Sequence, residues 1–280
     1  MNKRLITSQL MRNFETQLRV DEKSDLTVEK YLRDIRQFAT YADGREVDKP
    51  RLLEYKAILE KKCAITSANS KIAAINSFLR FAGWQELCLR QFRVQKKIYC
   101  PEEKEISKAE YLRLVETAKR RGNERLELLL QTICGTGIRV SEVKHITAEA
   151  VICGEAVVHC KGKTRVVIIV RALQKRLLKY CRARGIKSGS VFVTSSGRPL
   201  NRTNIWREMK SLCKEAGVAA GKVFPHNLRH LFARVFYGIE KDIVKLADVL
   251  GHSSINTTRI YVMTTGAEHR RKMESMRLIL

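Results

Sequence analysis

Apolar residues recur at the spacing of an α-helix through most of this chain, and this pattern restricts its fold more than any other feature. In residues 28–41, for example, they fall at intervals of three and four, which places them on one helix face. Only residues 156–170 are rich in Val and Ile, in two short runs. The turn between the runs, at 161–164, predicts a β-hairpin. We therefore expect a mainly α protein with a small antiparallel β-sheet.

A break in the helical pattern between residues 87 and 105 divides the chain. Residues 1–86 carry four predicted helices, which is enough for a small helical domain with its own core. The break alternates apolar residues with basic ones and predicts an extended basic linker. A capping box, Ser107 to Glu110, then starts a second domain over residues 106–280. Helices are expected there at 108–121, 124–134, 172–184, 202–216, 226–237, 241–250, 254–263 and 267–277, with a short one ending at Val143.

The positive charge of the chain points to a polyanionic partner. Lys and Arg number 54 against 29 Asp and Glu, a formal net charge of +25, and residues 161–210 hold fourteen basic side chains with one acid, Glu208. Such a one-sided field disfavours the compact state unless a polyanion neutralises it, so nucleic acid is the leading partner. An anionic membrane surface or an acidic protein could also neutralise the positive charge, but no separate basic amphipathic helix supports a membrane partner. With 44% hydrophobic residues, the chain is too apolar to be a disordered basic tail.

Other functional classes find little support. No run of 18 apolar residues and no signal-like start occur, which disfavours membrane-spanning and secreted proteins. The eight cysteines are scattered without a CxxC pair or a Cys/His zinc spacing, so we expect neither a metal site nor disulfides. Scattered thiols favour a reducing cytoplasm.

Three short segments carry residues suited to phosphate chemistry. Residues 225–230 read Pro-His-Asn-Leu-Arg-His, which starts a helix and sets His226 and Arg229 on one face of its first turn, where the helix dipole favours an anion. Residues 250–261 place His252 at a helix junction, nine positions before Tyr261. Residues 136–142 place Arg139 directly after a glycine turn. Taken singly, each segment is explained as well by an ordinary surface or packing role.

Taken together and in this order, the three segments resemble the motifs of the tyrosine recombinase (phage-type integrase) family. The arginine motif reads Thr-Gly-Ile-Arg-Val-Ser-Glu at 136–142, the HxLRH box lies at 226–230, and the LGHSS…TT…Y block runs from 250 to 261. The resemblance spans nearly the whole chain. It implies a SAM-like helical core-binding domain at 1–86, the basic linker at 87–105, and an α+β catalytic domain with a C-terminal tail at 106–280.

The resemblance also implies a role for each catalytic residue. Tyr261 would attack a DNA phosphate, giving a 3′-phosphotyrosyl link and a free 5′-hydroxyl. Arg139 and Arg229 would hold the non-bridging oxygens, His252 would donate a further hydrogen bond, and His226 would assist proton transfer from the phenol. The family's lysine lies on a β-hairpin turn and protonates the leaving oxygen. Lys161 is the first choice for it, and Lys163 is an alternative because the turn is one residue shorter than usual.

Elementary chemistry supports this set. A phosphodiester gains negative charge on its equatorial oxygens in the transition state, and guanidinium groups bind such an array bidentately without losing their charge. Tyrosine, with a pKa of about 10, needs positive neighbours and a base to react at neutral pH. The phosphotyrosyl ester retains the bond energy, so joining requires neither ATP nor a metal cofactor. Glu142 and His230 are expected to support the site by packing.

The resemblance further implies duplex DNA with inverted half-sites, a dimer on each site and a tetramer in the synapse. An accessory directionality factor could assist. The C-terminal piece could dock on its own domain or on a neighbouring protomer. Two other functions share the fold: a type IB topoisomerase-like enzyme that relaxes DNA, and a non-catalytic DNA-binding regulator. Side chains expected to contact DNA lie in the linker, in the hairpin turn and on the 202–216 helix: Arg93, Lys96, Lys97, Lys163, Arg202, Asn204, Arg207 and Lys210.

Overall fold

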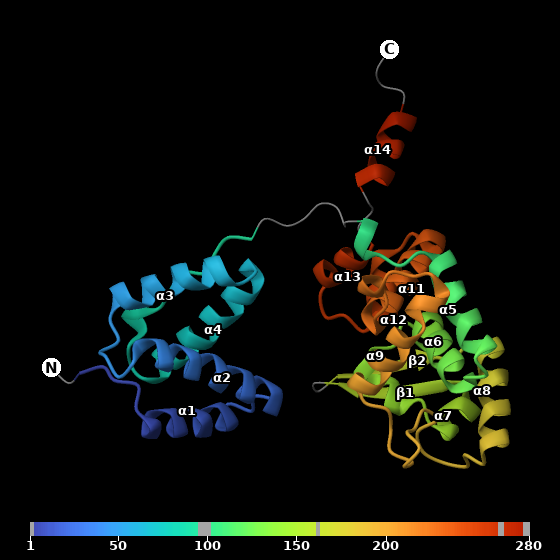
Figure 1. The fold of residues 1–280 in the computed structure, drawn as a ribbon, viewed down its shortest axis with the longest axis horizontal. Coiled ribbons are helices and arrows are strands. Elements are labelled where there is room, and N and C mark those ends of the chain that lie inside the picture. Colours follow the sequence, from blue (N-terminus) through green and yellow to red (C-terminus); the bar gives the residue numbers. More distant parts are fainter. Residues whose placement is uncertain (1–2, 95–101, 161–162, 263–265, 277–280) are drawn as a thin grey trace. The chain divides into compact units, whose positions relative to one another are not determined.

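The computed structural model describes residues 3–94, 102–160, 163–262 and 266–276. Contacts between residues divide the chain into two compact units, Met1–Lys96 and Lys97–Leu280 (Figure 1). Helices make up most of the described chain and one two-stranded antiparallel sheet makes up the rest of its regular structure, so the predicted fold class is confirmed.

The first unit contains four α-helices followed by a short 3₁₀ turn (Figure 1). Helices α2 and α4 pack against each other at the centre, with α1 against α2 and α3 against α4. The core is aromatic, and Phe14 meets Phe78 edge to face with ring centroids 5.3 Å apart. The elements are α1 (Ser8–Val20), α2 (Asp25–Ala42), α3 (Lys49–Lys62), α4 (Ile65–Phe81) and η1 (Gln85–Leu87).

The first half of the expected linker packs against this unit. Asn76 of α4 bonds both the amide and the carbonyl of Leu89, at 2.8 Å each. Asn69 does the same for Phe92, at 2.8 and 2.9 Å. These bonds satisfy the backbone of an otherwise unpaired extended segment. Residues 88–94 have no regular secondary structure and belong to the helical unit.

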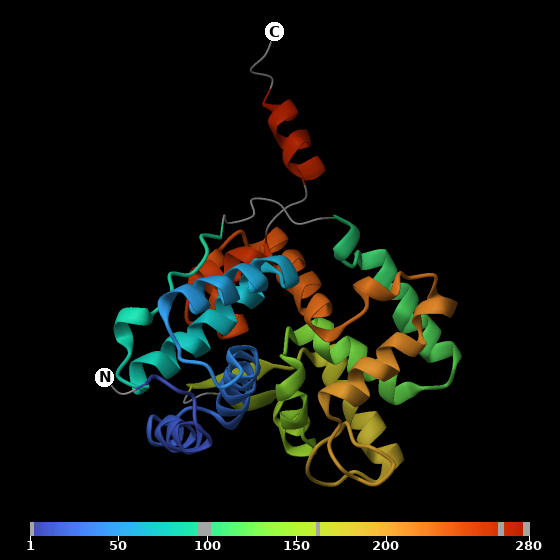
Figure 2. The ribbon, with the colours of Figure 1, turned by 60° about the vertical axis from the view of Figure 1, so that its left-hand side comes forward.

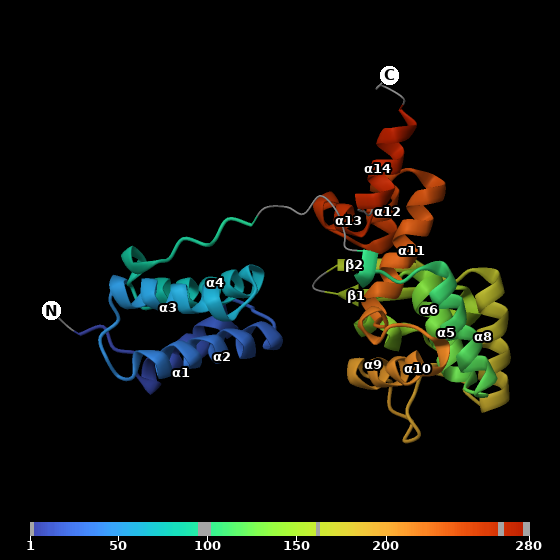
Figure 3. The ribbon, with the colours of Figure 1, turned by 45° about the horizontal axis from the view of Figure 1, so that its top comes forward.

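The second unit packs helices against one face of the small sheet and around a buried helix, α6 (Figures 2 and 3). Helix α6 packs against α11, α5 and α8. In chain order its elements are η2 (Glu102–Lys104), α5 (Lys108–Arg120), α6 (Glu124–Thr136), η3 (Val140–His145), α7 (Ala148–Cys153), β1 (Glu155–Cys160), β2 (Lys163–Ile168), α8 (Arg171–Arg184), α9 (Arg202–Ser211), α10 (Cys213–Ala216), η4 (Ala220–Lys222), α11 (Pro225–Glu240), α12 (Ile243–Leu250), α13 (Ile255–Tyr261) and α14 (Gly266–Ser275).

The hairpin register places one face of the sheet in the core. Val158 lies opposite Arg165, and Cys160 lies opposite Lys163. Because successive strand residues alternate in direction, Arg165 shares its face with Val167, which is buried. The connection between the strands is therefore two residues long, against the four expected, and Lys163 belongs to β2.

Local departures from the predicted elements have simple causes. The helix expected at 202–216 is two helices, α9 and α10, which meet at Leu212. The short helix ending near Val143 is the 3₁₀ turn η3, which starts after an extended Arg139. Helix α7 was not predicted, because six residues are too few to show a clear period. Within the described part of the chain, every helix falls short of the length and apolarity that a bilayer crossing demands.

Candidate active site

The N-terminus of α11 brings three of the relevant side chains together. Pro225 occupies the first turn, where its missing N–H costs nothing. His226 and His230, one turn apart, meet ring to ring with centroids 4.8 Å apart. Arg229, between them, points inward and is only 1% exposed. This buried arginine is the centre of the site.

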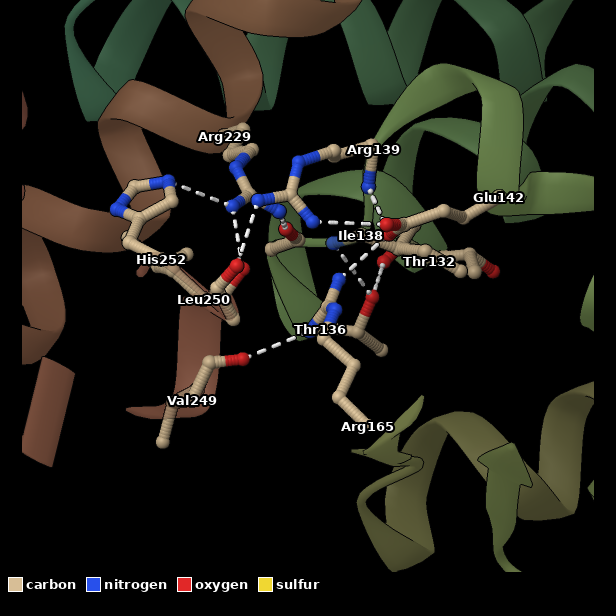
Figure 4. Close-up of polar contacts among 12 residues, drawn as sticks. Thr132, Thr136, Ile138, Arg139, Glu142, Arg165, Arg229, Val249, Leu250 and His252 are labelled. Atoms are coloured by element: carbon tan, nitrogen blue, oxygen red, sulfur yellow. Dashed lines mark hydrogen bonds and ion pairs between the residues drawn. The ribbon is translucent and has the colours of Figure 1, made fainter. Parts of the chain in front are cut away.

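Arg229 is held by backbone carbonyls from two other segments (Figure 4). It donates through Nη1 to the carbonyl of Gly137 and through Nη2 to that of Leu250, the latter at 2.6 Å. Its Nη2 also lies 3.0 Å from Nε2 of His252, whereas its Nε has no hydrogen-bond partner within the described part of the chain. Burial, reinforced by nearby Arg139, lowers the pKa of Arg229 to about 10, so it remains charged at neutral pH. The guanidinium thus ties the turn after α6 to the end of α12.

Arg139 lies next to Arg229 and is fixed by Glu142. Its Nη1 donates to Glu142 Oε1 at 2.8 Å, and its own backbone amide donates to Oε2 at 3.0 Å. Its Nη2 donates to the carbonyl of Gly251 at 2.9 Å. Gly137 makes this turn possible, because its φ is +62° and a Cβ there would stand 2.5 Å from Phe232. Two guanidinium groups from distant segments therefore lie side by side (Figure 4).

Arg165 on β2 is a third cation in this network, and the sequence analysis missed it. Its Nη2 donates to Glu142 Oε2 at 2.6 Å, and its Nη1 donates to the carbonyl of Val249 at 2.7 Å. Burial alone would raise the pKa of Glu142, but hydrogen bonds from Arg139 and Arg165 outweigh it and lower that pKa. The alternation of the strand was the available signal, since it puts Arg165 on the inward face.

Gly251 leaves room for the side chain of Arg165 in this network. It ends α12 in the left-handed conformation, with φ +62°, and a Cβ there would stand 2.3 Å from Cδ of Arg165. The turn directs Nε2 of His252 toward Arg229 of α11, while its Nδ1 lies 2.9 Å from Oγ1 of the buried Thr258 in α13. The same turn thus positions both His252 and Arg165.

Tyr261 ends α13 and lies among the histidines of the site. Its hydroxyl is 3.5 Å from Nε2 of His226, and its ring stacks on His230 with centroids 4.2 Å apart at 23°. The ring is 4.9 Å from that of His252 and 5.8 Å from the guanidinium of Arg229. Although Tyr261 is only 7% exposed, polar rings and a guanidinium surround it. The phenol therefore meets both cationic and proton-accepting groups.

The histidines of the site are neutral at neutral pH. Burial lowers the pKa of His226, His230 and His252 to about 4 each, with nearby Arg229 contributing in all three cases. Neutral imidazoles can accept protons, whereas the guanidinium groups supply fixed positive charge. A cleft of about 630 Å³ opens beside them, and Arg139, Arg165, His252 and Ser253 contribute to its lining. The arrangement can bind an anion and accept a phenolic proton.

The structure places Arg139, His226, Arg229, His252 and Tyr261 together, as the sequence motifs predicted. Lys161, Lys96 and Lys97 lie outside the described residues, and Lys163 is described only as a backbone position in β2. No cluster of three metal-ligating side chains occurs in residues 3–94, 102–160, 163–262 or 266–276.

The remaining residues expected to contact DNA lie elsewhere. Arg93 is exposed on the first unit, and Arg202 and Arg207 are exposed on α9. Asn204 accepts from the Asn201 amide in a capping box, which engages its side-chain oxygen. Lys210 donates to the carbonyl of Ala220 and lies over the ring of Trp206.

Comparison with known proteins gives two family matches. Residues 104–268 match the model of the phage integrase family, and residues 11–86 match that of the phage integrase N-terminal SAM-like domain. These two matches cover most of the chain.

Curated relatives and solved structures agree with these matches. Tyrosine recombinase XerA of Pyrococcus furiosus is 28% identical over all of this chain and 98% of its own length. Tyrosine recombinase XerC of Lacticaseibacillus casei is 31% identical over 91% of this chain and 93% of its own. The crystal structure of the XerH site-specific recombinase, in a post-cleavage complex with a palindromic difH substrate, superimposes with a TM-score of 0.72. It covers 95% of this chain and 83% of that one at 19% identity, which supports the fold.

Proposed function

This chain belongs to the phage integrase family, the tyrosine recombinases, and from that premise we propose that Tyr261 is the nucleophile with which it cuts and rejoins DNA. The resemblance predicted from the three motifs is confirmed, and so is the class of activity, site-specific recombination of DNA. The contacts of Tyr261 with His226 and the neighbouring guanidinium carry the proposal.

The cleavage step forms one bond and breaks another. The phenolic oxygen of Tyr261 attacks phosphorus while the bond from phosphorus to the 5′ oxygen breaks, leaving a 3′-phosphotyrosyl ester and a 5′-hydroxyl. His226, whose Nε2 lies 3.5 Å from the hydroxyl, accepts the phenolic proton. A neutral imidazole is needed for this task, and the pKa of about 4 keeps it neutral. Joining is the reverse reaction, in which a 5′-hydroxyl attacks the ester.

Arg139 and Arg229 stabilise the charge on the phosphate. Fixed donors that need no rearrangement during the reaction are the most effective form of this stabilisation. Glu142 and the carbonyls of Gly137, Gly251 and Leu250 hold the two guanidinium groups in place before DNA arrives. His252 contributes a hydrogen bond to the same oxygens. The leaving 5′ oxygen takes its proton from a lysine of the hairpin, for which Lys161 is the first candidate and Lys163 the alternative.

The DNA partner follows from charge and fold. We expect duplex DNA with inverted half-sites, two protomers on each site, and two such dimers in the synapse. Arg93, Lys96 and Lys97 would contact phosphates, and Arg202, Asn204, Arg207 and Lys210 of α9 would contact base edges. Phosphate contacts of this kind position a protein without selecting a sequence. The expected place of action is the cytoplasm, at the nucleoid.

The experiment that tests Tyr261 is covalent trapping. The full chain is incubated with a duplex that carries a nicked target site, and adducts that survive SDS are separated by electrophoresis. The target duplex is first selected from random-sequence DNA by retention on the protein. The wild type should form an adduct, whereas Tyr261→Phe should form none and should bind the same DNA with an unchanged Kd. Tyr237→Phe, which removes a phenol from the neighbouring part of α11, is the matched control and should form the adduct.

The outcomes separate the competing functions. An adduct that persists in Tyr261→Phe would remove Tyr261 from the role. Binding with no adduct from the wild type, on nicked DNA, would favour a non-catalytic regulator. Relaxation of supercoiled plasmids that lack the selected sequence, at the rate seen with it, would favour a type IB topoisomerase-like enzyme.

A further inference from the structure

A second group of titratable side chains lies beside the nucleophile and has no part in the chemistry above. Glu105, which precedes α5, is 7% exposed and forms an ion pair with Arg234 of α11. Its other carboxylate oxygen, Oε1, lies 3.8 Å from Nδ1 of His230. That nitrogen is buried and has no hydrogen-bond partner among the described residues. A buried carboxylate therefore faces an unpartnered imidazole nitrogen.

The backbone around Glu105 is fixed to α11 from both sides. Asn227 donates through Nδ2 to the carbonyl of Lys104 at 2.9 Å. Arg234 donates through Nη2 to the carbonyl of Ile106 at 2.6 Å, and the side chain of Ile106 is fully buried in the core. Residues 104–106 thus follow any movement of α11, and α11 follows theirs. In the sequence, this segment follows shortly after the division between the two units at residues 96 and 97.

His230 connects that segment to Tyr261. Its ring stacks on the Tyr261 ring at a centroid distance of 4.2 Å and an angle of 23°, nearer to parallel than the contacts of Tyr261 with His226 or His252. A stacked ring restricts how the tyrosine can turn about its own side-chain bonds. The orientation of His230 in turn depends on what its Nδ1 faces, which is Glu105.

We propose that Glu105 and His230 are positioning residues for Tyr261, and that through them residues 104–106 control the orientation of the nucleophile. The proposal rests on the function proposed above for Tyr261. A carboxylate opposite Nδ1 favours the tautomer that carries its hydrogen there, because that hydrogen can be donated to the oxygen. The distance of 3.8 Å is too long for a hydrogen bond, but a shift of about 1 Å of the Glu105 carboxylate toward Nδ1 would form one. Contacts of this kind in DNA-free enzymes commonly tighten only when the substrate is bound.

The test measures single-turnover adduct formation on the nicked duplex, with the Kd for the same duplex measured in parallel. Glu105→Gln keeps the shape of the side chain and removes its charge, and His230→Phe keeps the stacked ring and removes Nδ1. Each should slow adduct formation about tenfold with Kd unchanged, since positioning residues behind a reacting group typically contribute 10- to 100-fold. The double variant should be no slower than the slower single variant, because both residues act through one contact. Glu116→Gln, an exposed glutamate of α5, is the matched control and should react at the wild-type rate.

Three results would overturn the proposal. The first is a wild-type rate in Glu105→Gln. The second is a double variant whose loss equals the product of the two single losses, which would mean that Glu105 acts through Arg234 and not through His230. The third is a parallel loss of DNA binding and rate, which would mark a general structural defect. If the wild type forms no adduct at all, the proposed function of Tyr261 fails first, so the two failures are distinguishable.

Discussion

Arg229 donates a hydrogen bond through Nη2 to Nε2 of His252, 3.0 Å away. A guanidinium can only donate, so Nε2 accepts here and the hydrogen of the neutral imidazole stands on Nδ1, from which it is donated to Oγ1 of Thr258. The role proposed for His252 on the phosphate requires the opposite arrangement, with the hydrogen on Nε2. Phosphate binding must therefore displace His252 from Arg229 and exchange its tautomer. A hydroxyl can serve both tautomers, because it donates as well as accepts.

Thr258→Val should consequently slow cleavage without weakening DNA binding. The substitution keeps the shape of a fully buried side chain but removes the partner of Nδ1 in both tautomers. Loss of such a supporting hydrogen bond costs about 10- to 100-fold. Single-turnover adduct formation on nicked DNA measures the effect, and Thr258→Ser, which keeps the hydroxyl, should restore most of the rate. If Thr258→Val formed the adduct at the wild-type rate, this role for Thr258 would be excluded.

Gly251→Ala should destabilise the second unit. The residue has φ +62°, which costs an L-amino acid about 1 kcal/mol, and its Cβ would displace Arg165 from Glu142 and from the Val249 carbonyl. Together these effects should lower the free energy of unfolding by about 2–4 kcal/mol, measured by urea denaturation. Gly221→Ala is the control, because nothing stands within 4 Å of its Cβ and its φ is not positive, and it should change stability by less than about 0.5 kcal/mol. Equal stability of the two variants would show that Arg165 can move away from a Cβ at position 251 without lowering the free energy of unfolding.

The stability of the DNA-free protein should fall as the pH drops from about 6.5 toward 4. The pKa of His230 is about 4 in the folded chain, because of burial and of Arg229, and about 6.5 in the unfolded chain. Between these values the unfolded chain binds more protons, so acid favours unfolding, whereas above pH 7 this group contributes no slope. Between pH 7 and pH 4, the free energy of unfolding of His230→Phe should therefore fall by about 1–3 kcal/mol less than that of the wild type. Urea denaturation of both proteins at several pH values measures the difference, and parallel curves would contradict the expectation.

The order of the sequence motifs was enough to predict which residues meet in the site. Arg139, Arg229, His252 and Tyr261 come from three separate segments, and Gly137, Pro225 and Gly251 mark the helix ends next to the first three of these residues. The burial and the hydrogen-bond partners of these side chains could not be predicted in the same way. The burial of Arg229 depends on carbonyls supplied by two other turns, and a motif of six letters says nothing about those turns.

Two other features were within reach of the sequence. Strand alternation placed Arg165 beside buried valines, and a basic residue on an inward face is a signal of a buried ion pair. The pattern Asn-x-x-Asn at 201–204 is a capping box, which restricts the side chain of Asn204 that was expected to contact DNA. Glu105, by contrast, belongs to an acidic run beside the basic linker, and only the tertiary contact with α11 distinguishes it from its neighbours.

The hairpin offers the last prediction, because its register separates the two candidate lysines. Cys160 pairs with Lys163, so Lys161 lies in the two-residue connection while Lys163 stands within β2. The family's general acid lies on a hairpin turn, whereas strand pairing places the backbone of Lys163 within β2. Lys161→Ala should therefore reduce adduct formation at least 100-fold, whereas Lys163→Ala should mainly weaken DNA binding.

A substrate with sulfur in place of the bridging 5′ oxygen distinguishes general acid catalysis from other causes. A thiolate leaves readily without a proton, since thiols have pKa values near 8.5 and alcohols far higher. The Lys161→Ala variant should then cleave the sulfur substrate at nearly the wild-type rate, while a variant damaged in phosphate binding, such as Arg139→Ala, should stay slow on both substrates. Rescue of Lys163→Ala in place of Lys161→Ala would reverse the assignment. Rescue of neither would mean that the proton reaches the leaving oxygen from outside the hairpin.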